Sequence, residues 1–431
     1  MVVTGRLVAA AAVGAVLVTF AVPSWLGVAL TSLTIFTLMM IDLALMGRAD
    51  DLLLERTPLS VVRLGRSIDS ELVVTNIGDR HIRGLLWDDW PYSTRPAHRE
   101  HRIDLAPGTR TRLRTTLTPT HRGDRAAGPI TLRLLGPLGM AGRQTRQTVD
   151  TRVRALPPFR SERLLVSKAK QLQLLEGRNR STLRGQGTEF DSFREYVPGD
   201  DVRAIDWRAT ARAADVLVRT WRPERNRHVL MLLDTGRISA ARVGDGTRLD
   251  AAIEAALLLG GLAAAAGDTV GLLAYDRRVR CEVSAENGRG LQPKLMHALA
   301  GVTPALVDTD TGGLVREAVH RSRRRGLLVW FTGLDGVAAA ENLVPVLPMP
   351  ARRHRVLIVS VTDPEIAAAA DDRTDLDAIY RAAAAETRLA EQALVQESLR
   401  RMGVSVVAAT PERLPEVLAD EYLELKRSGA V

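Results

Sequence analysis

The sequence predicts an α/β protein built from an N-terminal transmembrane helical hairpin, a small β-sandwich, and a doubly wound parallel-sheet domain. Three observations support this fold class. Two apolar runs open the chain, short alternating segments with Gly and Pro turns follow, and apolar strands then alternate with helical segments. We place the domain boundaries at 1–50 (hairpin), 51–158 (β-rich domain), 159–227 (linker and charged segment) and 228–431 (sheet domain).

The composition excludes several classes of function. The chain has 431 residues, of which 46% are hydrophobic and 4% aromatic, and its net charge of +9 is spread along the sequence. Few stacking residues, and a positive charge spread along the chain, argue against a nucleic-acid partner. The single cysteine, Cys281, excludes an intrachain disulfide. Because no phosphate-binding loop, zinc-protease or nucleophile-elbow motif occurs, we expect no cofactor, and no small-molecule substrate is evident.

The first two apolar runs predict the hairpin. Residues 7–22 are uncharged, and residues 25–46 contain one charge, Asp42. A membrane-spanning helix needs about 20 apolar residues, with a range of ~17–25. Arg6 and Arg48 flank the pair, so the positive-inside rule puts both outer ends in the cytoplasm. We expect a multi-pass cell-membrane protein with a cytoplasmic bulk and with Asp42 hydrated at the interface; the alternative is a cleaved signal peptide.

The next hundred residues predict the β-sandwich. Residues 71–79 alternate between apolar and polar side chains and end on Asn-Ile-Gly-Asp. Residues 101–123 form two strand-like segments around a Pro-Gly turn. Several short strands at regular spacing with such turns are typical of a small sandwich.

From residue 228 the pattern predicts a parallel sheet covered by helices on both faces. Apolar strands that alternate with helices are typical of this fold. The expected strands are 228–234, 268–276, 327–331, 355–361 and 404–408. The expected helices are 248–267, 291–301, 311–326, 337–347, 376–402 and 412–426, with one more at 164–176 in the linker.

The segment between the linker and the first of these strands carries a dense mixture of charges and aromatic residues. Pro198-Gly199 indicates a turn, and Asp200 is then a natural helix N-cap. A helix from Asp201 would place Arg203 and Trp207 on one face.

Three roles remain open for this segment. Arg203, Asp206 and Arg212 could form ion pairs that lock it onto the sheet domain, the segment could bind a partner, or its carboxylates could be catalytic. We take the candidate interaction residues to be Arg194, Glu195, Tyr196, Asp200, Asp201, Arg203, Asp206, Trp207 and Arg212.

The stretch GQGTEFDSFREYVPGDDVRAIDWRATAR resembles the bacterial family called domain of unknown function 58. The downstream stretches LMLLDTG, GDTVGLLAYD and GLLVWFTGLD are similar to the strands of the von Willebrand factor A-like domain in that family. The resemblance implies a membrane protein encoded beside a MoxR-type AAA+ ATPase. The family has no established catalytic activity that the resemblance could assign to this chain.

In metal-binding A domains, a D-x-S-x-S loop, a threonine and a third-loop aspartate form an oxygen cage for Mg²⁺. Asp234 and Thr309 match this pattern. Gly236 stands where a serine belongs and Gly333 where the aspartate belongs, although Asp335 could replace it after a shift. We therefore expect a degenerate site that holds no metal.

These observations predict a membrane-anchored, cytoplasm-facing interaction or scaffold protein whose leading partner is a MoxR-type AAA+ ATPase. The alternative is an enzyme of unknown reaction that uses the carboxylates of the charged segment.

Overall fold

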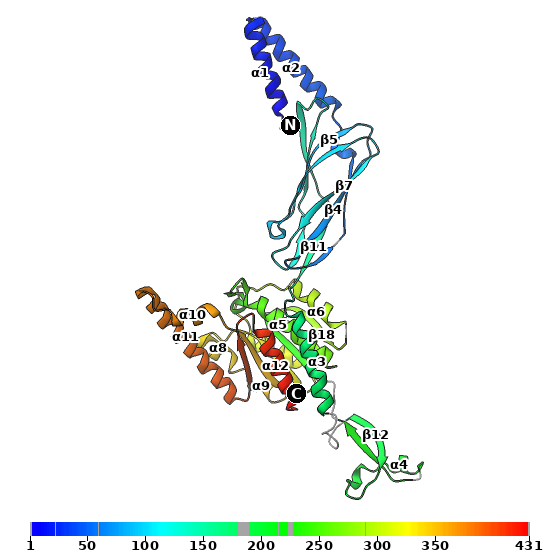
Figure 1. Ribbon diagram of the computed structural model, residues 1–431, viewed down its shortest axis with the longest axis vertical. Helices are drawn as coiled ribbons and strands as arrows, with labels where there is room; N and C mark the ends of the chain where they lie inside the picture. The colour runs from blue at the N-terminus through cyan, green and yellow to red at the C-terminus, as the bar shows by residue number, and fades with distance from the viewer. Residues whose placement is uncertain are drawn as a thin grey trace. The chain divides into compact units, whose positions relative to one another are not determined.

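The computed structural model describes residues 2–21, 23–58, 60–179, 189–213, 215–222, 227–288 and 290–429. The chain divides into two compact units, Met1–Leu156 and Pro157–Val431 (Figure 1). The first unit contains the predicted hairpin and the β-rich domain. The second contains the linker, the charged segment and the predicted sheet domain.

Two apolar helices, α1 (Gly5–Ala21) and α2 (Trp25–Leu45), open the first unit. They pack closely, since a Cβ atom added at Gly14 would lie 2.6 Å from Thr31 Cγ2. Ser24 caps α2 by accepting a hydrogen bond from the Gly27 amide at 3.1 Å. Within the described part of the chain, α2 is the one helix that is long and apolar enough to cross a membrane; α1 is shorter.

Three sheets form the β-domain that follows. Their strand orders are β1-β10-β9-β5-β6, β2-β4-β7 and β3-β11-β8, and among the strands that the structure describes here only β3 and β11 pair in parallel. The strands are β1 (Val2–Val3), β2 (Leu52–Arg56), β3 (Ser60–Arg63), β4 (Ile68–Asn76), β5 (Ile82–Asp88), β6 (Glu100–Leu105), β7 (Arg110–Leu117), β8 (Gly123–Ala126), β9 (Ile130–Leu135), β10 (Ala141–Gln147) and β11 (Arg152–Leu156), with short 3-10 turns at Ala49–Asp51 and Tyr92–Thr94.

Alternating burial explains why these segments form sheets that face one another. Along β9, Ile130, Leu132 and Leu134 are buried and the residues between them are not. These side chains share one core with Leu72 and Val74 of β4 and with apolar residues of β2, β5 and β6. The first two sheets therefore pack face to face, as the alternating pattern predicts.

Asp42 attaches α2 to the β-domain. Its carboxylate is fully buried and accepts three hydrogen bonds from backbone amides, those of Leu138 (2.6 Å), Met140 (2.8 Å) and Ala141 (3.0 Å). The expectation that Asp42 is hydrated at a membrane interface is therefore wrong. The turn between β9 and β10 supplies the donors that water would otherwise provide, and the sequence gives no sign of this contact.

The start of α1 is bound to the same turn. The Thr4 hydroxyl donates to the carbonyl oxygen of Gly139 at 2.6 Å, and an Arg6 Nη atom donates to that of Leu138 at 3.0 Å. Just before them, β1 pairs antiparallel with β10. Both ends of the hairpin therefore meet one turn, residues 136–141, which we call the anchoring turn.

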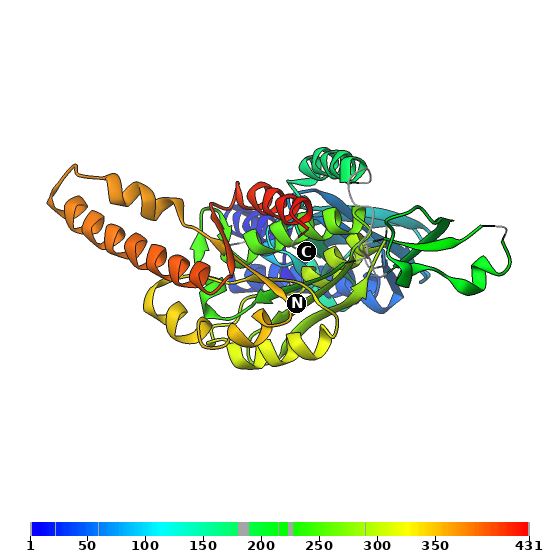
Figure 2. The same cartoon turned by 90° about the horizontal axis from the view of Figure 1, so that it is seen from below.

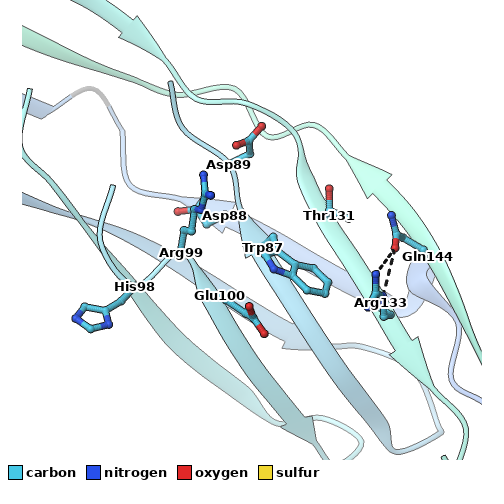
Figure 3. Close-up of a pocket in the computed structure, with 9 residues that line it drawn as sticks. All are labelled: Trp87, Asp88, Asp89, His98, Arg99, Glu100, Thr131, Arg133 and Gln144. Carbon is cyan, nitrogen blue, oxygen red and sulfur yellow. Dashed lines mark hydrogen bonds between the residues drawn. The ribbon is translucent and has the colours of Figure 1, made fainter. Parts of the chain in front are cut away.

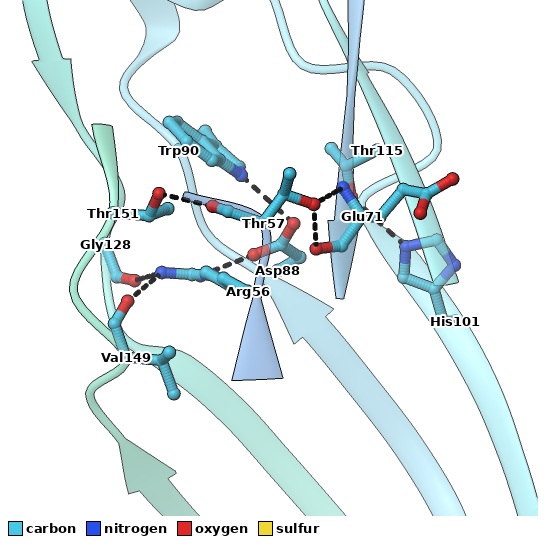
Figure 4. A network of polar contacts seen from close by, with 10 residues as sticks. All are labelled: Arg56, Thr57, Glu71, Asp88, Trp90, His101, Thr115, Gly128, Val149 and Thr151. Atoms are coloured by element: carbon cyan, nitrogen blue, oxygen red, sulfur yellow. Dashed lines mark hydrogen bonds and ion pairs between the residues drawn. The ribbon is translucent and has the colours of Figure 1, made fainter. Parts of the chain in front are cut away.

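A buried ion pair joins further strands of the β-domain (Figure 4). Arg56 at the end of β2 and Asp88 at the end of β5 have fully buried side chains and contact at 2.5 Å. Arg56 also donates to the carbonyl oxygens of Gly128 (3.0 Å) and Val149 (2.8 Å), and the Trp90 indole N–H donates to Asp88 at 3.0 Å. These contacts partly offset the cost of burying the pair, although Arg56 Nε has no hydrogen-bond partner among the described residues.

The second unit is built on a six-stranded sheet of order β18-β17-β14-β19-β20-β21, parallel except for β18. Its strands are β14 (His228–Asp234), β17 (Thr269–Tyr275), β18 (Val279–Glu286), β19 (Gly326–Phe331), β20 (Arg355–Val361) and β21 (Ser405–Ala409). A small ribbon, β15 (Arg242–Val243) and β16 (Gly246–Thr247), precedes the first long helix, and a 3-10 turn spans Arg237–Ala240.

Helices cover both faces of this sheet (Figure 2). The helices α5 and α12 contact one face, whereas α7, α8 and α11 share a core with the other, and α3 packs on α5. The helices are α3 (Glu162–Asn179), α5 (Arg248–Ala265), α6 (Leu291–Ala300), α7 (Thr311–Arg321), α8 (Gly336–Leu343), α9 (Pro348–Ala351), α10 (Pro364–Asp371), α11 (Leu376–Arg401) and α12 (Leu414–Arg427).

All five predicted strands of this sheet are present, and their ends differ by at most one residue. The helix predicted for 311–326 is too long: α7 ends at Arg321, and the arginine run after it forms the turn into β19. The edge strand β18 and the helix α10 were not predicted. Because β18 is mostly exposed, it lacks the apolar run that marks the central strands.

The Asp42 contact predicts a large and specific loss of stability. We expect Asp42→Ala to lower the free energy of unfolding of the first unit by about 3 kcal/mol, because three amides, two of them in buried contacts, lose their acceptor. The measurement is the thermal unfolding midpoint of the full chain in detergent. Asp50→Ala removes the same charge from an exposed position and should leave the midpoint unchanged. Equal midpoints for the two variants would contradict the contact.

Candidate functional site

The charged segment forms a small β-hairpin. The strand β12 (Glu189–Glu195) pairs antiparallel with β13 (Leu217–Arg222), and residues 185–188 of the sequence motif lie outside the described residues. Two short turns lie between the strands, a 3-10 turn (Val202–Ala204) and α4 (Trp207–Thr210). The helix predicted to run on from Asp201 is therefore wrong, because Ile205 bridges to β13 and interrupts it.

The capping residues also differ from the prediction. Asp200 is not an N-cap: its carboxylate accepts hydrogen bonds from Arg194 at 2.5 Å and from the Val197 amide at 3.0 Å. These contacts close the turn in which Gly199 has a φ of +111°, a conformation that favours glycine. The caps are Asp201 for the 3-10 turn and Asp206 for α4.

Asp206 is a buried charge in this segment. It accepts hydrogen bonds from the amides of Arg208 and Ala209, both at 3.0 Å, and from Arg219 Nε of β13 at 2.6 Å. Arg219 was not among the candidate residues, and only the structure identifies it as the partner. Arg203 and Arg212, predicted to join Asp206 behind the surface, are exposed and form no ion pair with any described residue.

The ion pairs Arg194–Asp200 and Arg219–Asp206 each join two residues of the charged segment, so neither of them connects the segment to the sheet domain. The Arg194 guanidinium lowers the pKa of the Asp200 carboxyl. The Ala209 amide, together with Arg219, lowers the pKa of Asp206. Both carboxyls are thus held ionised at neutral pH, a state that suits a structural acceptor better than a proton donor.

The remaining candidate residues form the outer surface of this hairpin. Glu195, Asp201 and Arg203 are exposed, Trp207 is 66% exposed, and Tyr196 is half-buried. The segment therefore presents an indole ring among charges of both signs.

A second cluster lies at the carboxyl edge of the six-stranded sheet. Asp234, the last residue of β14, is buried and accepts hydrogen bonds from the Thr309 hydroxyl (2.5 Å), the Thr332 hydroxyl (2.8 Å) and the Gly236 amide (2.8 Å). Sequence reasoning paired Asp234 with Thr309 and missed the role of Thr332. A Cβ atom added at Gly236 would lie 2.1 Å from Thr309 Oγ1, so this threonine fills the space where a serine would stand.

This cluster does not fit a divalent cation. Asp335 does not replace the missing aspartate, because it pairs with buried Arg248 and accepts from Gln392 at 3.2 Å. An Arg248 Nη atom would lie 2.9 Å from a Cβ atom at Gly333, which puts a fixed positive charge beside the third loop. No group of three His, Cys, Asp or Glu side chains among the described residues is placed to hold a metal ion.

A cavity of about 610 Å³ lies on the β-domain (Figure 3). The Arg133 guanidinium lies over the Trp87 ring, 4.9 Å from its centroid, and donates to Gln144 Oε1 at 3.1 Å. His98 on its rim has a φ of +54°, which is uncommon for a residue other than glycine. This cavity was not predicted; a half-buried tryptophan on the solvent side of β5 is the one signal that could have suggested it.

The fold and these sites define a parallel α/β sheet domain preceded by a mixed-charge hairpin. Residues 192–372 match the family described as Protein of unknown function DUF58, so the chain carries a domain of this family.

The chain is also similar to proteins of mycobacteria. These are the uncharacterized protein Rv1480 of Mycobacterium tuberculosis (strain ATCC 25618 / H37Rv) and the uncharacterized protein Mb1516 of Mycobacterium bovis, each 30% identical over 206 residues. The match covers 46% of this chain and 63% of each relative, less than two thirds of their length.

Two solved structures that resemble parts of the chain do so weakly. WR4, a C. elegans MSP family member, is 13% identical with a TM-score of 0.18, covering 24% of this chain and 97% of its own. A beta-glucosidase from Listeria innocua is 13% identical with a TM-score of 0.16, covering 24% of this chain and 16% of its own. Neither supports an inference about fold or function.

Because Asp234 is buried, we predict that replacing it with the neutral side chain of asparagine raises the stability of the protein, by an amount that depends on pH. Burial raises the pKa of this carboxyl above its value in the unfolded chain, so stability is lost as the pH rises through the folded-state pKa. We expect Asp234→Asn to unfold at a higher temperature than wild type at pH 7, with a difference that shrinks towards pH 4. The Thr332 hydroxyl can turn and accept from the new amide group.

The effect of Mg²⁺ on the unfolding temperatures of wild type and Asp234→Asn tests whether the cluster holds a metal ion. A ligand bound only by the native state at 100 times its Kd would add about 2.7 kcal/mol. We expect no rise in the unfolding temperature of wild type with Mg²⁺ relative to a chelator. A rise that Asp234→Asn abolishes would mean that the site holds a metal.

Proposed function

We propose that the protein is a multi-pass, membrane-anchored interaction or scaffold protein whose bulk faces the cytoplasm. The observation that carries the proposal is the attachment of both ends of the apolar hairpin to the anchoring turn. A hairpin held in this way leaves from and returns to one side of a bilayer, and Arg6 and Arg48 make that side the cytoplasmic one.

The dimensions and surface of the hairpin support the membrane part of this proposal. Because α2 has 21 residues at about 1.5 Å each, it is about 31 Å long, close to the ~30 Å hydrocarbon core of a bilayer. Large apolar side chains are exposed along both helices: Val8, Val13, Val16, Leu17, Phe20, Trp25, Leu26, Leu30, Leu33, Phe36, Met40, Ile41 and Leu45. In water such a surface would be a large unpartnered apolar patch.

The sheet domain fits a von Willebrand factor A-like fold with a degenerate metal position. In its favour are the central place of β14, the antiparallel edge strand β18, and the pairing of Asp234 with Thr309 at the carboxyl edge. With Arg248 beside the third loop, docking by this domain would not use a metal ion.

The exposed face of the charged hairpin is our candidate for partner binding. Trp207 and Arg203 belong to the residue types that dominate binding energy at protein interfaces. From the resemblance in sequence we propose a MoxR-type AAA+ ATPase as the partner. Among the described carboxyls of this segment, Asp200 and Asp206 are held in structural contacts, which favours binding over the enzymatic alternative.

Membrane topology gives one prediction. A reporter that works only in the cytoplasm should be active when fused after Val431. The pair Leu33→Arg and Phe36→Arg should release the protein from membranes in an alkaline wash, because each arginine at a helix centre costs about 2.5–3.5 kcal/mol. Leu53→Arg with Val61→Arg changes exposed apolar residues of the β-domain and should leave it in the membrane. A reporter active only outside the cytoplasm would favour a cleaved signal peptide.

The proposed binding of a partner gives a second prediction. We expect Trp207→Ala and Glu195→Ala to fold normally and to weaken co-purification with the ATPase, by roughly 30-fold for the tryptophan if it is a hot spot of about 2 kcal/mol. Tyr92→Ala removes an even more exposed aromatic side chain from the first unit and should bind as wild type. If Trp207→Ala and Glu195→Ala both bind the ATPase as tightly as wild type, the exposed face of the charged hairpin is not the interface.

A further inference from the structure

A second cavity lies at the base of the hairpin, inside the first unit. Its volume is about 420 Å³, within the ~300–1,000 Å³ range of ligand pockets. Two segments line most of it, the residues that follow α2 and the neighbouring faces of β9 and β10. The lining residues are Leu43, Ala44, Met46, Gly47, Arg48, Ala49, Asp51, Asp79, Arg80, Leu134, Arg143 and Thr145.

Three arginines give this cavity its chemistry. Arg48, Arg80 and Arg143 are exposed, and none of them forms an ion pair with a residue that the structure describes. Arg80 donates to the carbonyl oxygens of Ala44 (2.6 Å) and Met46 (3.4 Å), which neutralises the partial negative charge at the C-terminal end of α2. The guanidinium groups of Arg48 and Arg143 remain available to an anion, and guanidinium matches phosphate oxygens well.

The position of the cavity indicates which anion it meets. If α2 spans the hydrocarbon core, the residues just after Leu45 fall in the headgroup layer, where lipid phosphates lie. Arginines at this level on the cytoplasmic side face the negative surface of the inner leaflet. The cavity is therefore at the depth of a lipid phosphate and carries the opposite charge.

We infer that this cavity binds the phosphate of an anionic glycerophospholipid, through Arg48 and Arg143. Asp51 and Asp79 on the lining select the rest of the headgroup, because they can accept hydrogen bonds but would repel a second negative charge. The glycerol hydroxyls of phosphatidylglycerol supply such donors, whereas the choline of phosphatidylcholine has none. The inference rests on the proposed membrane anchoring of the hairpin.

Native mass spectrometry of the detergent-solubilised full chain tests this inference, with phosphatidylglycerol and phosphatidylcholine as the probes. We expect wild type to retain one phosphatidylglycerol in preference to phosphatidylcholine. The double variant Arg48→Gln with Arg143→Gln should weaken this retention by roughly 25-fold, because each arginine near an anionic lipid contributes about a factor of five. Arg80 is left in place because it contacts the end of α2.

Arg146→Gln is the matched control. It lies three residues from Arg143 on β10, so its side chain points to the opposite face of the sheet, and it should retain phosphatidylglycerol as wild type does. An equal loss in Arg146→Gln, or equal retention of both lipids by wild type, would overturn the inference. Displacement of the lipid by inorganic phosphate at comparable concentration would assign the cavity to free phosphate and overturn the lipid source.

An alkaline wash of membranes separates this inference from the proposed function. The double variant should stay in the membrane fraction while it loses its lipid. Wild type that is itself washed from the membrane would refute the anchoring, whatever the lipid result. Wild type that stays in the membrane without lipid preference would refute the pocket alone.

Discussion

One carboxylate, that of Asp42, determines how the first unit is put together. Burying a charge near the end of an apolar helix costs free energy unless hydrogen-bond donors surround it. Here the backbone amides of Leu138, Met140 and Ala141 are these donors. The amides in turn need an acceptor, because the turn is packed against α2. Each side therefore requires the other, and the helix end and the turn between β9 and β10 form one structural element. The binding of Thr4 and Arg6 to the same turn brings the start of α1 to this point as well.

Buried charges play the same part elsewhere in the chain. In the β-domain, Arg56 and Asp88 tie β2 to β5 with both side chains fully buried. In the sheet domain, Arg248 and Asp335 tie the start of α5 to the loop after β19, at the carboxyl edge of the sheet. In both places a paired arginine and aspartate hold together elements that are distant in the sequence.

The sequence predicted the parallel strands well because each is a continuous apolar run with polar ends. This pattern can be recognised without knowing which strands lie next to each other. It failed where a partner distant in sequence decides the outcome. Asp42 and the turn at residues 138–141 are almost a hundred residues apart, and Asp206 finds Arg219 only because β12 and β13 pair. Local signals around Asp200 and Asp201 favoured a helix, whereas the strand pairing of Ile205 with Val218 interrupts it. Thr332 was overlooked because its hydroxyl reaches Asp234 from the loop after β19, 98 residues further along the chain.

The union of hairpin and β-domain through Asp42 is the central claim, and amide hydrogen exchange of the full chain in lipid nanodiscs tests it most directly. The backbone amides of Leu138, Met140 and Ala141 should exchange slowly, because each donates to a buried carboxylate. In Asp42→Ala the same amides should exchange much faster while those in the middle of β9 remain protected. Fast exchange of the three amides in the wild-type protein would show that the turn is open to water and that the hairpin and the β-domain are not joined at this point.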